Sequence, residues 1–118
     1  MPGFRAKVVD AGPLALSAQE DRLHNYELVV VIDPRVVDEE VPDAIERLVR
    51  RPIENRGGAI GEVDHWGRRK LAYPIRSQLE GNYVVTHFQM APNETKELEQ
   101  GLRISEEVIR HLLVRKEE

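Results

Sequence analysis

The sequence has no cysteine among its 118 residues. A disulfide framework, a cysteine nucleophile and a zinc site with cysteine ligands are therefore excluded. The sequence also lacks the run of about 20 apolar residues that a membrane-spanning helix needs. We therefore expect a soluble, cytoplasmic protein with no membrane partner.

Motifs that would indicate an enzyme are missing as well. There is no phosphate-binding glycine loop, no serine nucleophile elbow and no carboxylate pair with a spacing typical of an acid and a base. His65 stands beside Asp64, and His87 could approach them across a hairpin, but such strand histidines are far more often ordinary polar residues than metal ligands. We predict no catalysis, no metal, no cofactor and no small-molecule substrate.

Acidic residues only slightly outnumber basic residues, but the two kinds are unevenly distributed along the sequence. The formal net charge is -4, whereas a protein that simply coats nucleic acid is usually basic. Between Asp64 and Glu80, however, there is no acidic residue, and this interval contains four cations: Arg68, Arg69, Lys70 and Arg76. One face of an acidic molecule could therefore be basic.

The length allows one domain with one core. Residues 1–24 mix Gly, Pro, Ala and charges without a sustained period, which predicts a flexible N-terminal extension, and residues 25–118 would form the domain. Residues 26–32 are apolar on both parities, as in a strand covered on both faces, and Asp33 with Pro34 ends it.

An amphipathic helix is predicted next, because apolar residues recur at spacings of three and four from Val41 onward. Pro42 is tolerated in the first turn, but Pro52 removes a bond to the carbonyl of Leu48, so we expect a kink or an early end there. Gly57 and Gly58 would then close the helix.

The second half of the chain predicts two strands, a helix and a final strand. Residues 59–76 have period two with a bulge or bend at Gly67, residues 77–81 form the turn, and residues 82–90 form the other strand of a hairpin. A short helix follows, with Asn93 as its cap, and residues 108–115 form the last strand.

This order predicts an α+β, ferredoxin-like β-α-β-β-α-β fold, in which two helices cover one face of a four-stranded antiparallel sheet. A sheet covered on one side normally alternates apolar and polar residues. Here both parities are apolar, as Tyr83 and Val85 show beside Val84. The open face could therefore meet a partner, although the N-terminal extension or another subunit is an equal reading.

The decapeptide of residues 66–75, WGRRKLAYPI, closely resembles the signature of the bacterial small-subunit ribosomal protein six family. Other family-like pieces follow in the same order, including Tyr26-Glu27, Gly58, Gly81-Asn82-Tyr83 and the segment that leads to residues 108–111. The resemblance covers about residues 25–116. It implies a structural protein of the small ribosomal subunit that binds the central domain of small-subunit rRNA together with ribosomal protein eighteen.

The candidate RNA contacts are the cations of the basic interval and two arginines that match family positions. On a strand, Arg68 and Lys70 leave one face and Arg69 the other. Arginine pairs with phosphate oxygens through two donors and lysine acts as a point charge; the other reading is a cationic strand edge that resists aggregation. The candidate RNA-binding residues are Arg68, Arg69, Lys70, Arg76, Arg103 and Arg110.

The aromatic residues favour protein contacts over base stacking. The strand at 82–90 lacks the aromatic-rich pattern of RNA-recognition motifs, so core or subunit packing is the expected role. The candidate partner-interface residues are Trp66, Tyr73, Tyr83 and Val85. The alternative function is a ferredoxin-like binding or regulatory module that oligomerises through its open sheet face.

Overall fold

The computed structural model describes residues 22–116. Its four strands are β1 (His24–Ile32), β2 (Ala59–Ile75), β3 (Gln78–Met90) and β4 (Val108–Arg115). Between β1 and β2 lie η1 (Asp38–Glu40), α2 (Val41–Ile45), η2 (Glu46–Arg50) and α3 (Arg51–Asn55), and between β3 and β4 lie η3 (Pro92–Glu94) and α4 (Thr95–Ile104). Within the described residues, no helix has the length and apolar character that crossing a membrane requires. Most of the expected extension, residues 1–24, lies outside the described residues, and His24 already belongs to β1.

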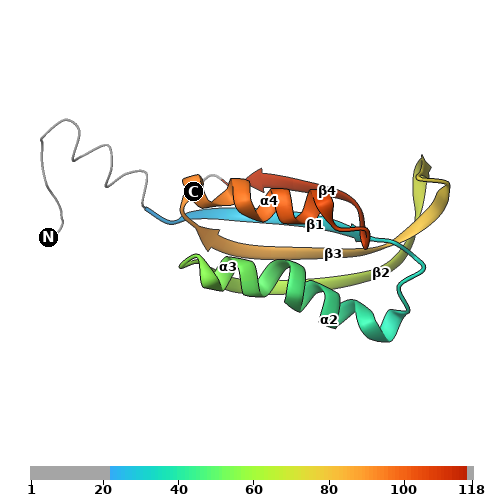
Figure 1. The fold of residues 1–118 in the computed structure, drawn as a ribbon, viewed down its shortest axis with the longest axis horizontal. Helices are drawn as coiled ribbons and strands as arrows, with labels where there is room; N and C mark the ends of the chain where they lie inside the picture. The colour runs from blue at the N-terminus through green and yellow to red at the C-terminus, as the bar shows by residue number, and fades with distance from the viewer. Residues whose placement is uncertain (1–21, 117–118) are drawn as a thin grey trace, which may run out of the picture.

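The strands form one antiparallel sheet in the order β2-β3-β1-β4. The segment α2–α3 and helix α4 pack on the sheet (Figure 1), and their apolar side chains join those of the strands in a single core cluster. The predicted ferredoxin-like arrangement is confirmed, and β4 matches the expected strand residue for residue.

The core lies between the sheet and the helices. Strands contribute every second residue, because successive side chains of a strand point to opposite faces. The fully covered strand residues include Leu28, Val30, Ile32, Val84 and Met90. The helices contribute Val49, Ile53, Leu98 and Leu102, which are also almost completely buried.

Of the two expectations at Pro52, a kink or an early end, the early end is wrong, because the first helix continues through Pro52 to Asn55. The segment before the proline, Glu46–Arg50, is π-helical, and the backbone N–H of Arg51 donates to the carbonyl of Glu46. A π-helical turn lets the chain absorb the hydrogen bond that proline cannot make. Gly57, at φ 85°, closes the helix as predicted.

The β2–β3 hairpin differs from the prediction at its turn. Gly67 has φ 84° and the register shifts between His65 and Gly67, which confirms the bulge. The turn, however, is at Arg76 and Ser77, which both have positive φ, and β3 already begins at Gln78. Two consecutive residues at positive φ make the tight turn that suits a twisted hairpin. The predicted turn at 77–81 is therefore wrong, and the hairpin is longer than expected.

Helix α4 begins without the cap expected from Asn93. Residues Pro92–Glu94 form a 3₁₀ turn, and no side chain caps the helix. The hydroxyl of Thr95 donates to the carbonyl of Pro92 at 2.8 Å. The position of Asn93 inside the 3₁₀ turn explains why the predicted cap is wrong.

Candidate RNA and protein interface

The distal part of the hairpin, residues 68–82, extends past the rest of the sheet (Figure 1). We call this part the hairpin arm. Leu71 of the arm packs with Val31 of β1 and Ile109 of β4 in a second, smaller apolar cluster, to which Ile75 adds its side chain. The arm therefore bends over one end of the open sheet face and covers it.

Gly81 permits this bend. A Cβ atom added at Gly81 would lie 2.4 Å from Cγ1 of Val31 and 3.4 Å from Cδ1 of Ile109. Only a residue without a side chain allows strands to approach so closely. The glycine therefore sets how tightly the arm packs on the sheet.

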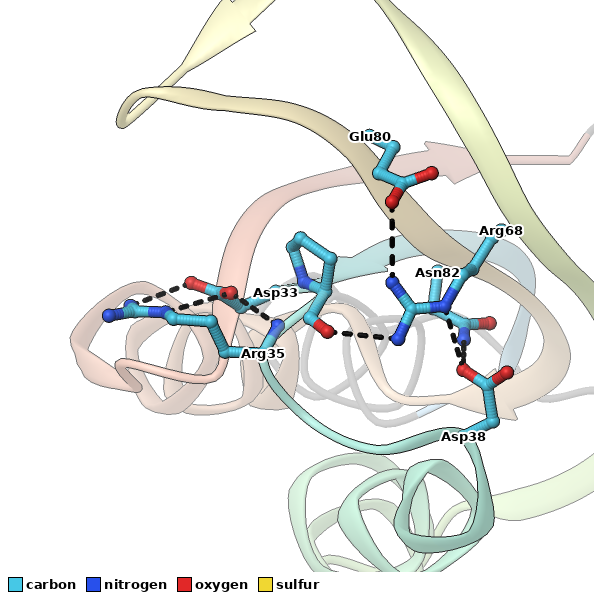
Figure 2. A network of polar contacts seen from close by, with 7 residues as sticks. Asp33, Arg35, Asp38, Arg68, Glu80 and Asn82 are labelled. Carbon is cyan, nitrogen blue, oxygen red and sulfur yellow. Dashed lines mark hydrogen bonds and ion pairs between the residues drawn. The ribbon is translucent and has the colours of Figure 1, made fainter.

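Arg68 ties the base of the arm to the segment that follows β1 (Figure 2). Its Nε donates to Oδ1 of Asp38 at 3.0 Å, and its Nη2 donates to the carbonyl of Pro34 at 2.9 Å. Nη1 lies 3.6 Å from Oε2 of Glu80, and the side-chain amide of Asn82 donates to the same Asp38 oxygen at 3.1 Å. Arg68 is thus held by acceptors of its own chain, and its first role is to position the arm.

A second arginine closes the turn after β1. The backbone N–H and Nε of Arg35 both donate to Oδ1 of Asp33, at 2.9 and 3.1 Å, and Nη2 donates to Oδ2 at 2.8 Å (Figure 2). These side-chain hydrogen bonds hold the pKa of Asp33 below its ordinary value against the effect of burial, with a smaller contribution from Arg76 of the arm. The buried carboxylate is therefore ionised at neutral pH.

A groove runs between this turn and the arm. It has a volume of about 640 Å³ and is lined by Pro34, Arg35, Arg68, Lys70 and residues 77–80. Arg68 and Lys70 lie on the same side of the arm, as the alternation of a strand predicts. Three cations line this groove together with Glu80, and two of them, Arg35 and Arg68, are already paired with carboxylates of the chain.

The opposite side of the arm joins the open sheet face through aromatic residues. Trp66 stacks on Tyr83 with ring centroids 6.4 Å apart, and the guanidinium of Arg69 lies 5.3 Å from the centre of the Trp66 ring. On the far side, Nη1 of Arg110 donates to the hydroxyl of Tyr73 at 3.1 Å. This bond links the arm to β4 across the open face.

The open face retains exposed apolar side chains beside the arm. Trp66 is 49% exposed, Tyr73 58%, Leu112 52% and Val114 45%. Val85, by contrast, is only 2% exposed and packs within its own chain. The expected partner-interface residues thus share this side of the sheet, but Val85 offers almost no surface to a partner.

The six candidate cations do not form one patch. Arg68, Arg69, Lys70 and Arg76 lie on the arm, and Arg110 lies beside it on β4. Arg103 lies on α4, in the layer that covers the other face of the sheet. Their role in RNA binding stays a prediction.

Three residues that shape this region were not found from the sequence: Arg35, Asp38 and Asn82. The contacts of Asp38 with Arg68 and Asn82 are set by the approach of the arm to the turn after β1, and join residues 30 and 44 positions apart along the chain. Only the contact between Asp33 and Arg35 could have been predicted from the local sequence, because an aspartate side chain commonly accepts a hydrogen bond from the backbone N–H two residues further along the chain.

Comparisons with known proteins agree with this architecture. The family model described as Ribosomal protein S6 matches residues 25–115. The small ribosomal subunit protein bS6 of Clostridioides difficile is 46% identical over 92 residues, which cover 78% of this chain and 98% of the relative. The bS6 of Caldanaerobacter subterraneus subsp. tengcongensis is 42% identical over 93 residues, which cover 79% and 97%.

Solved structures lead to the same family. The crystal structure of 30S ribosomal protein S6 from Thermotoga maritima has a TM-score of 0.75 and 35% identity, and covers 80% of this chain and 89% of that one. The C-terminal domain of the MgtC protein from Mycobacterium tuberculosis, at 11% identity and a TM-score of 0.55 over 80% and 88% of the two chains, shows the fold alone. The chain therefore belongs to the ribosomal protein S6 family of the small ribosomal subunit and is a ribosomal protein rather than an enzyme.

Proposed function

We propose that this protein binds the central domain of small-subunit rRNA together with ribosomal protein eighteen of the small subunit. The proposal rests on three cations of the hairpin arm that form no ion pair in the part of the chain that the structure describes. Within the described residues, Arg69, Lys70 and Arg76 have no carboxylate at ion-pair distance, whereas Arg68 has two. Cations without a carboxylate partner on an extended arm are available to phosphate oxygens.

The arm is held in place before RNA binds. Arg68 anchors its base, Leu71 packs on the sheet, and the Arg110–Tyr73 hydrogen bond fixes its far side. Binding then loses little conformational entropy, because the arm is already ordered. The contacts would go mainly to the RNA backbone, and the aromatic residues next to Arg69 belong to the protein interface.

The exposed part of the open face is the proposed site for the partner protein. Trp66, Leu112 and Val114 present apolar surface next to the arm, so one partner could cover this face and approach the same RNA. The net charge of -4 opposes binding to RNA by this chain alone. The partner would add cations of its own, which makes RNA affinity depend on the pair.

The experiment is a gel-shift titration of a central-domain rRNA fragment with this protein, with and without ribosomal protein eighteen, at several salt concentrations. The test variant changes Arg69, Lys70 and Arg76 to Ala. We expect partner-dependent binding, and a slope of log K against log salt that is smaller by about 2–3 in this variant, at about 0.9 per lost phosphate contact.

The control variant changes Arg47, Arg50 and Arg51 to Ala, which alters net charge equally on the first helix. It should bind almost as the wild type does. An equal loss in both variants would show that overall charge, and not the arm, controls binding. A stable homodimer in size-exclusion chromatography, with no RNA binding in any combination, would favour a module that oligomerises through its open face.

A further inference from the structure

Three side chains with metal-binding atoms meet on the open face, away from the hairpin arm. Glu62 and Asp64 of β2 and His87 of β3 each offer one ligand atom, and these atoms all lie within 4.8 Å of one another. We propose that they bind a divalent first-row transition metal ion, with Zn²⁺ as the probe of choice. The proposal is independent of RNA binding.

An irregularity in β2 brings the two carboxylates to this face. Ile60 pairs with Phe88 and Val63 with Thr86, so an extra residue of β2 lies between these pairs. Such a bulge reverses the alternation of side chains. Ile60 consequently joins the core on the helix side, while Glu62 and Asp64 both stand next to His87.

The ligand types fit a first-row transition ion. Imidazole nitrogen and carboxylate oxygen are both zinc ligands, and three protein ligands leave one position for water or another group. In a tetrahedral site with bonds of about 2.0–2.1 Å, ligand atoms lie about 3.4 Å apart. Rotation of the exposed Glu62 side chain and of the half-buried Asp64 and His87 side chains can shorten the present separations to this value, while the paired strands keep the backbone fixed.

The local electrostatics favour a cation. Within the described residues, the side chains of Glu62, Asp64 and His87 make no hydrogen bond and no ion pair. Glu27 of β1 lies directly opposite His87 and adds a further carboxylate, and the cation next to it, Lys116, is paired with Glu27 at 3.7 Å. Two neighbouring carboxylates without a counterion repel each other, and a divalent ion would remove that repulsion.

His65 provides a matched control. It follows Asp64 in the chain, yet it points to the helix side, where it lines a pocket with Ile45 and Val49. A site made of His65, Asp64 and His87 is therefore geometrically excluded. If any histidine near the surface could bind the metal ion, replacing His65 or His87 would weaken binding equally.

The test is isothermal titration calorimetry of the untagged full chain with ZnCl₂, for the wild type and for His87→Ala, Glu62→Gln and His65→Ala. We expect one saturable site, weakened at least about tenfold by His87→Ala and by Glu62→Gln, and unchanged in His65→Ala. Circular dichroism checks that each variant is folded. Glu62 is exposed, so Glu62→Gln keeps the test valid if His87→Ala fails to fold.

Two results would overturn the proposal. One is the absence of saturable Zn²⁺ binding to the folded wild type. The other is a ranking of the variants that does not single out the cluster, with His87→Ala and Glu62→Gln weakening binding no more than His65→Ala does. Neither result would bear on RNA binding, because these residues lie outside the basic arm.

Discussion

The two faces of the sheet differ in what covers them and in how the sequence encodes them. The helix side is sealed by α2, α3 and α4 with regular alternation, so that Leu28, Val30 and Ile32 of β1 are fully buried. The open side is covered at one end by the chain's own hairpin arm and is exposed around Leu112 and Val114. One face provides stability, and the other keeps exposed apolar surface, which is the proposed site for a partner protein.

The hairpin arm is stabilised by two kinds of contact. It is held on one side by polar groups of the turn after β1 and on the other by a small apolar cluster around Leu71. Substitutions that separate these contributions can therefore test the contrast between the faces.

The sharpest contrast uses two leucines on opposite faces. Leu28 is 0% exposed and Leu112 is 52% exposed. Leu28→Ala should lower the free energy of unfolding by about 2–5 kcal/mol, because it removes buried methyl groups and leaves a cavity. Leu112→Ala should stay within about 0.5 kcal/mol. Urea unfolding followed by circular dichroism measures both, and equal losses would contradict the division of the sheet into a sealed and an open face.

Two glycines test the packing of the arm. Gly81→Ala should cost about 1–3 kcal/mol, because the new methyl group would overlap the buried side chain of Val31. Gly101→Ala in α4 meets no atom within 4 Å and should stabilise the protein by up to about 1 kcal/mol, since alanine favours helices. Thermal unfolding should show a lower melting temperature for Gly81→Ala and a higher one for Gly101→Ala. A neutral Gly81→Ala would mean that the arm does not rest closely on β1.

The turn at the end of β1 should respond to pH. The folded-state pKa of Asp33 is lowered, chiefly by hydrogen bonds from Arg35, so its stabilising effect is complete above the ordinary pKa of 3.8 and is lost as pH falls through the folded value. Asp33→Asn should therefore destabilise by about 1 kcal/mol at pH 7 and progressively less below pH 3.8. Urea unfolding at several pH values tests this; a constant difference down to acidic pH would contradict it.

The anchoring of the arm should give the smallest effect on global stability. Arg68→Ala removes two hydrogen bonds of a solvent-accessible side chain, worth about 0.5 kcal/mol together after screening by solvent. Lys70→Ala, two residues away on the same side, should change stability hardly at all. Hydrogen–deuterium exchange should be faster in residues 68–82 only for Arg68→Ala. Equal exchange in both variants would contradict an anchoring role.

The sequence predicted the sealed face well and the open face poorly, for physical reasons. The apolar residues on both parities at 26–32 revealed β1, and the spacing of three and four from Val41 onward revealed the first helix, because both elements contribute to the core. The bulge between Ile60 and Val63 cannot be seen in the sequence pattern. Its one extra residue moves the side chains before it to the opposite face of the sheet from the one that simple alternation predicts. Glu62 lies in no recognisable motif, and the register of the hairpin places it next to His87.

The hairpin turn shows a second limit. We predicted Gly81 as a turn residue, but in the structure it allows the close approach of the arm to Val31. The turn is formed instead by Arg76 and Ser77, which have positive φ although they carry side chains. The partners of Arg68 were equally hidden, because Asp38 and Pro34 are brought to it only by the folded arm. Cations could be found from the sequence, but not which of them are already paired.

The measurement that tests the central proposal most directly is hydrogen–deuterium exchange of this protein alone, with ribosomal protein eighteen, and with that protein plus the central-domain rRNA fragment. We expect the partner to protect β4 and the strand segment around Trp66, and RNA to add protection in the arm, residues 68–82. Protection confined to α2, α3 and α4, with the arm unchanged by RNA, would contradict the proposed interface.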